Sequence, residues 1–94
     1  MLSETDARWM LEMLEALAAK LGVRVRLEAV GAREDERVFQ GGTCFFKGER
    51  LIVVDSRLSP AGQCRALAAE LRKVDLSQVF VHPRVRFYLE DGSA

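Results

Sequence analysis

Four consecutive apolar residues, Leu51–Val54, constrain the fold of this chain more than any other feature. They form its only uninterrupted run of β-formers, and such a run is typical of a strand that is covered on both faces. Ser59 and Pro60 predict a helix start, because serine accepts hydrogen bonds from free backbone N–H groups and proline fits the first helical turn. We therefore expect a turn, a strand, a loop and a helix within Gly48–Lys73. The apolar stripe of that helix comprises Cys64, Leu67, Ala68 and Leu71.

A second long helix is predicted near the N-terminus. Ser3 can cap its first turn, and Gly22 stands where helices commonly end in a left-handed residue. Apolar residues recur between them at helical spacing and form one continuous stripe. This stripe comprises Ala7, Met10, Leu11, Leu14, Leu17, Ala18 and Leu21.

The opposite side of this N-terminal helix is also apolar in part. At about 100° per residue, Trp9, Met13 and Ala16 line up away from the main stripe. One explanation is that a loop or the C-terminal segment covers Trp9. The other is an apolar patch that docks a second subunit, since Trp and Met are enriched at interface centres. The second explanation predicts a homodimer, or contact with another protein.

The remaining pattern predicts two more strands and a short helix. Residues 23–30 alternate between apolar and charged, so Val23, Val25, Leu27 and Ala29 are expected to face the core. A second strand covers residues 43–47, and a hairpin turn at Lys47–Arg50 leads into Leu51–Val54. Gly31–Gln40 is expected to be a charged, solvated loop. His82-Pro83 begins a last short helix that ends near Gly92, with Val85, Tyr88 and Leu89 on its buried side.

These elements define the expected fold class. We expect one α+β domain over residues 1–94, with a small three-stranded, mostly antiparallel sheet. The two main helices pack on one face of the sheet, and a short C-terminal helix follows. The second and third strands must be antiparallel because a tight turn joins them, whereas the first and second strands fit either direction.

Charge and composition exclude several function classes. Fourteen basic residues balance fourteen acidic ones, so no net positive field attracts nucleic acid, and nucleic-acid binding is the least favoured of the expected functions. No segment has the apolar length of a membrane span, and the acidic start lacks the features of a signal peptide. Cys44 and Cys64 are expected to be reduced core residues. We therefore expect a bacterial cytoplasmic protein.

The sequence offers little catalytic machinery. His82 is the only histidine, and its place before Pro83 favours a helix cap or a surface residue over a base. A cysteine on an apolar stripe has a raised pKa and stays inert. No Cys/His spacing suits zinc and no glycine-rich nucleotide motif occurs, so we expect no catalytic residues, no metal and no cofactor. Gly41-Gly42 favours a bulge or strand entry over a phosphate site.

Paired arginines are the remaining candidates for a binding site. Arg24 and Arg26 share one strand face, and Arg84 and Arg86 lie in the last segment. Were the two pairs adjacent, they could contact phosphates. The formal net charge of zero favours the interpretation that these arginines are solvated at the surface.

Two segments resemble a known family. Arg50–Asp55, followed by Leu67–Lys73, is similar to the strand and helix at the core of the ImmA/IrrE-type zinc metallopeptidases. The similarity in element order covers about two thirds of the chain. In that family the helix reads approximately Leu-Ala-His-Glu-Leu-Gly-His. Here Ala69 and Lys73 stand where the two histidines are expected, and only Glu70 matches.

The resemblance implies a zincin-like scaffold that has lost its chemistry. Two of the three protein ligands of a catalytic zinc are missing, and a lysine ammonium would repel the cation. The corresponding face comprises Ala66, Ala69, Glu70 and Lys73. Glu70 and Lys73 are spaced to form an ion pair, and the small alanines leave a shallow surface where another helix can pack closely.

The sequence thus predicts a non-catalytic interaction or structural module that forms homodimers through Trp9, Met13 and Ala16. The alternative is a degenerate metallopeptidase, or another hydrolase that uses Glu70. A nucleic-acid-binding module ranks third.

Overall fold

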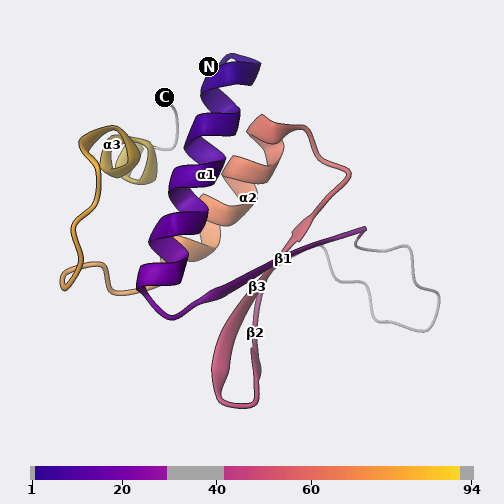
Figure 1. The fold of residues 1–94 in the computed structure, drawn as a ribbon, viewed down its shortest axis with the longest axis vertical. Coiled ribbons are helices and arrows are strands. Elements are labelled where there is room, and N and C mark those ends of the chain that lie inside the picture. The colour runs from indigo at the N-terminus through magenta and orange to yellow at the C-terminus, as the bar shows by residue number, and fades with distance from the viewer. Residues whose placement is uncertain (1, 30–41, 92–94) are drawn as a thin grey trace.

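The computed structural model describes residues 2–29 and 42–91 (Figure 1). The expected loop Gly31–Gln40, together with Gly41 and Gly92, lies outside the described residues. The described elements are α1 (Glu4–Lys20), β1 (Arg24–Glu28), β2 (Gly42–Phe46), β3 (Glu49–Asp55), α2 (Pro60–Leu71) and α3 (Pro83–Asp91). None of these helices is long and apolar enough to cross a bilayer.

The three strands form a mixed sheet in the order β1-β3-β2. β3 pairs with β2 in antiparallel register and with β1 in parallel register. The expected three-stranded sheet is confirmed, but it is half parallel rather than mostly antiparallel. The reason is that the tight hairpin places β2 on one side of β3, and β1 occupies the other side instead of pairing with β2.

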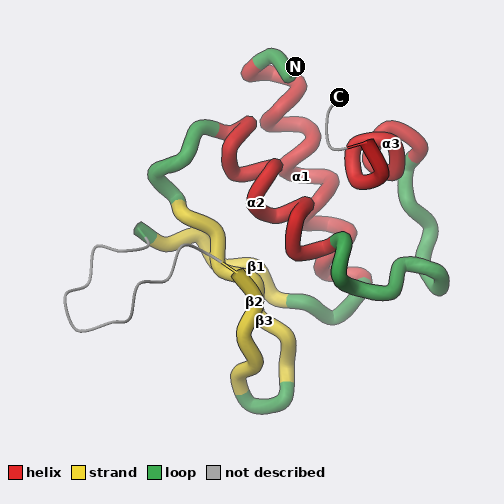
Figure 2. Tube along the Cα trace, turned by 180° about the vertical axis from the view of Figure 1, so that it is seen from behind, coloured by secondary structure: helices red, strands yellow, loops and turns green. Residues whose placement is uncertain are grey.

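The helices cover one face of this sheet (Figures 1 and 2). Ile52 and Val54 point toward the helices and are fully buried. Val53 points the other way and is still only 8% exposed, although no described helix packs on that face. The hairpin end of β2 and β3 projects past the helices, as Figure 2 shows. The expected arrangement of two main helices on one sheet face is confirmed.

Capping fixes the ends of α1 and α2 as the sequence predicts. Ser3 accepts a hydrogen bond from the Asp6 backbone N–H at 3.1 Å, and Ser59 accepts one from Gly62 at 3.2 Å. Gly22 has a φ of +73°, the left-handed conformation in which glycine carries no steric penalty. Between these caps, the predicted stripes supply most of the core.

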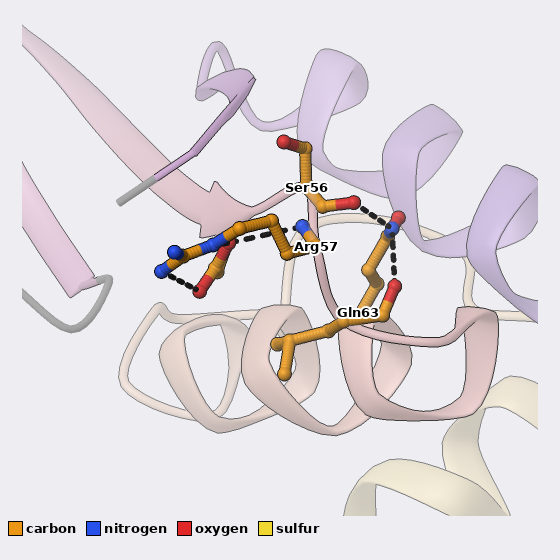
Figure 3. Close-up of polar contacts among 5 residues, drawn as sticks. Ser56, Arg57 and Gln63 are labelled. Atoms are coloured by element: carbon orange, nitrogen blue, oxygen red, sulfur yellow. Dashed lines mark hydrogen bonds and ion pairs between the residues drawn. The ribbon is translucent and has the colours of Figure 1, made fainter. Parts of the chain in front are cut away.

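The loop between β3 and α2 is held by side chains (Figure 3). The Gln63 amide Nε2 donates to the carbonyl oxygens of Ser56 at 3.4 Å and Leu58 at 3.0 Å. The backbone N–H of Arg57 and its guanidinium both donate to the Asp55 carboxylate. The chain therefore turns from the sheet into α2 in a defined path.

α3 packs against both long helices. Its buried residues are Val85, Tyr88 and Leu89, as the sequence predicts. Arg72, which ends α2, donates through Nε to the Leu89 carbonyl oxygen and through Nη2 to that of Tyr88 at 3.3 Å. The guanidinium therefore joins α2 to the C-terminal turn of α3.

One predicted core strand is only partly buried. Val23 is buried and Val25 half-buried, but Leu27 is 44% exposed and Ala29 is exposed. The expectation that Leu27 and Ala29 are core residues is therefore wrong, although the register places Leu27 beside Val54 on the helix-facing side of the sheet. Figure 1 shows the carboxyl end of β1 extending past the helices, which accounts for the exposure of this end of the strand.

Candidate functional site

The predicted zincin-like face forms the outer flank of α2, directly above the edge strand β2. The Glu70 side chain is only 14% exposed. Its Oε1 accepts a hydrogen bond from Thr43 Oγ1 at 2.6 Å, and Lys73 Nζ lies 3.3 and 3.4 Å from its two oxygens. Ala66 is half-buried beside this cluster and Ala69 is exposed. The face is thus a polar contact that holds α2 to the edge of the sheet.

Thr43 is the member of this cluster that sequence reasoning missed. The partners are 27 residues apart in the chain, so no local spacing connects them. A polar residue among the apolar residues of the second predicted strand is the one available signal. Across the described residues 2–29 and 42–91, no three His, Cys, Asp or Glu side chains come together as metal ligands.

The second stripe of α1 lies against the C-terminal segment. The Trp9 ring meets His82 edge-on at 5.3 Å between centroids, and the Arg84 guanidinium lies 4.8 Å from the Trp9 centroid. Met13 and Ala16 line a small hollow of about 40 Å³ that residues 80–82 help to form. Trp9 is half-buried, so the first of the two explanations describes it: the C-terminal segment covers this ring. Docking of a subunit on this stripe stays a prediction.

His82 caps α3. Its Nδ1 accepts a hydrogen bond from the Arg84 backbone N–H at 3.1 Å, and Pro83 occupies the first helical position. The expectation that His82 caps a helix is confirmed.

We expect His82→Ala to lower the free energy of unfolding by about 1 kcal/mol, because it removes this cap. His82→Asn supplies an amide oxygen as the capping acceptor in place of Nδ1 and should recover most of that loss. Urea unfolding followed through Trp9, the only tryptophan, measures both. Equal losses in the two variants would show that the cap contributes nothing.

The two cysteines occupy different layers. Cys64 is fully buried, its thiol lies 3.1 Å from the Ala7 carbonyl oxygen, and burial raises its pKa to about 11. Cys44 is only half-buried. It pairs with Leu51 on the sheet face that no described helix covers. The expectation of two core cysteines is therefore correct for Cys64 and wrong for Cys44.

The raised pKa of Cys64 predicts a loss of stability at alkaline pH. The folded state holds the thiol proton more tightly than the unfolded chain does, so this contribution is complete below pH 9.0 and declines as pH rises toward 11. We expect about 1 kcal/mol to be lost between pH 8 and pH 10. Urea unfolding of the natural protein and of Cys64→Ala measures the difference. An unchanged pH dependence in the variant would contradict this assignment.

The open face of the sheet carries the β1 arginines. Arg24 Nε lies 3.7 Å from Glu49 Oε1, and Arg26 Nη1 lies 3.2 Å from Glu28 Oε2. A shallow hollow of about 260 Å³ lies between Arg24, Arg26 and Glu49. The second arginine pair is on α3, which does not contact β1. The structure therefore does not bring the two arginine pairs together, and the β1 pair already faces carboxylates.

Exposed aromatic rings are the most conspicuous surface feature. Phe45 is 67% exposed, Phe80 is 72% exposed and Phe87 is 57% exposed. These three are all the phenylalanines whose side chains the structure describes. Among the described residues, the buried core contains Tyr88 as its one ring and is otherwise built from alanine, valine, leucine, isoleucine, methionine and cysteine side chains.

Comparison with known proteins finds no matching family model, no matching curated protein and no matching solved structure.

Proposed function

We propose that this protein is a non-catalytic interaction module that associates with a second copy of itself. The observation that carries the proposal is the exposure of Phe45, Phe80 and Phe87 by more than half. Exposed phenylalanine is costly in water, and aromatic side chains are enriched at protein interfaces. A chain that exposes these three phenylalanine rings has surface suited to a protein partner.

The proposed setting is the bacterial cytoplasm. Cys64 lies in the helix-side core and Cys44 on the opposite face of the sheet, so the sheet separates the two thiols. Reduced cysteines of this kind suit a reducing compartment.

Light scattering across a dilution series tests self-association. A mass that rises from one to two chains with concentration is the expected result. A single-chain mass at the highest attainable concentration would overturn the self-associating part of the proposal.

A second candidate is a zincin-like scaffold without its zinc. Two observations support this candidate: the described elements run in the order helix, three strands and helix, and Glu70 of α2 is the one residue of the family motif that this sequence keeps. Restoring the two histidines with Ala69→His and Lys73→His should create a zinc site beside Glu70. Arg65→His with Ala69→His is the matched control, because it has the same four-residue spacing elsewhere on α2.

The thermal midpoint with and without added zinc distinguishes these cases. A larger zinc-induced rise for the 69/73 pair than for the 65/69 pair supports the scaffold, and equal rises count against it. A zinc-induced rise in the unmodified protein would instead support a metal-dependent hydrolase that uses Glu70.

A further inference from the structure

We propose that the outer edge of β2 pairs in antiparallel register with β2 of a second copy. The two three-stranded sheets then form a single six-stranded sheet. This inference rests on the proposed self-association and names the surface that carries it. β2 is an edge strand, and no described residue pairs with its outer side.

The two edges of the sheet differ in composition. β1 exposes Arg24 and Arg26 and carries Glu28, and charged side chains are a common means of preventing edge-to-edge pairing. β2 reads Gly-Thr-Cys-Phe-Phe and has no charge and no proline. Of the two edges, β2 is therefore the one open to strand addition.

The register of the hairpin shows which backbone groups are available. Lys47 and Gly48 form a two-residue turn with φ of +53° and +81°, so the flanking pair Phe46 and Glu49 exchanges backbone hydrogen bonds. Pairs alternate along an antiparallel ladder, which directs the N–H and C=O groups of Thr43 and Phe45 outward.

A second β2, related to the first by a two-fold axis through Cys44, provides hydrogen-bond partners for all of these backbone N–H and C=O groups. Thr43 of each copy then exchanges hydrogen bonds with Phe45 of the other. The two Cys44 residues face each other as a non-hydrogen-bonded pair with Cα atoms about 4.5 Å apart. The strand is thus complementary to its own copy.

The side chains above the strand favour the same occupant. Thr43 and Phe45 share the face toward the helices, because Thr43 contacts Glu70 of α2. Pairing sets the exposed ring of Phe45 opposite Thr43 of the second copy, next to the flank of its α2. Ala66 and Ala69 of α2 are small side chains and leave room there.

Oxidative cross-linking tests the register directly. The chain has two cysteines, so mild oxidation should give a disulfide-linked dimer in the natural protein and in Cys64→Ser, and none in Cys44→Ser. Cα atoms at the expected separation fall within the range for disulfides. This measurement does not depend on any change to β2 other than at the thiol.

A matched pair of variants tests the contact without oxidation. Phe45→Lys places a charge on the pairing edge and should weaken the dimer at least tenfold in sedimentation equilibrium. Leu27→Lys introduces a charge at an exposed apolar side chain of β1, the opposite edge of the sheet, and should leave the dissociation constant unchanged.

The outcomes separate this inference from the proposed function. A natural protein that stays monomeric overturns both. A dimer that Phe45→Lys leaves intact, or that gives no Cys44 cross-link, overturns the β2 interface and leaves self-association standing.

Discussion

Replacing Leu67 with alanine is expected to lower the free energy of unfolding by about 3 kcal/mol, because the side chain is removed from a close-packed site. Leu67 is fully buried on the inner side of α2, and that helix packs against both α1 and the sheet. For a domain of this size, such a loss lowers the thermal midpoint by roughly 12–24 °C.

Leu58→Ala is the matched control for this prediction. It makes the same chemical change at a leucine that is 40% exposed, in the loop before α2. We expect a loss of less than about 1 kcal/mol there, since little buried area is removed. Similar losses at both leucines, measured by urea unfolding, would contradict the described core.

Arg72→Ala is expected to cost about 2 kcal/mol, the range for hydrogen bonds from a charged group. The guanidinium donates to the Tyr88 and Leu89 carbonyl oxygens, which lie at the end of α3 where the helix dipole favours a cation. Its removal leaves these acceptors without this donor and loosens α3.

Hydrogen exchange locates this effect. The backbone amides of α3 should lose protection in Arg72→Ala, whereas those of β3 should change less. Arg65→Ala, an exposed arginine on the same helix, is the control and should leave α3 protected. Uniform loss of protection across the chain would show that the contact is not local to α3.

Local patterns predicted the elements of this fold. The stripes of α1 and α2, the caps at Ser3 and Ser59 and the start of α3 at Pro83 depend on residues within a few positions of one another. Such signals can be read from sequence because their geometry is set by helix periodicity and backbone hydrogen bonding.

The contacts between elements could not be predicted in the same way. Strand order depends on which edge of β3 accepts β1, and the apolar alternation of residues 23–30 is compatible with several arrangements. Leu27 illustrates the limit, since its pattern indicates burial but the side chain is 44% exposed at the carboxyl end of β1. Likewise, the apolar stripe at Trp9 left two explanations, and only the placement of His82 and Arg84 shows that the C-terminal segment covers the ring.

The central position of β3 has a consequence during synthesis. β1 and β2 both precede β3 in the chain, yet each pairs only with β3 among the described strands. A nascent polypeptide that ends before Glu49 therefore contains β1 and β2 without β3, the strand with which both pair. In the same polypeptide, α1 has no α2 to pack against. Ribosome-bound intermediates of that length should be protease-sensitive until β3 and α2 leave the exit tunnel, when the β2–β3 hairpin can form first because its contacts are nearest in sequence.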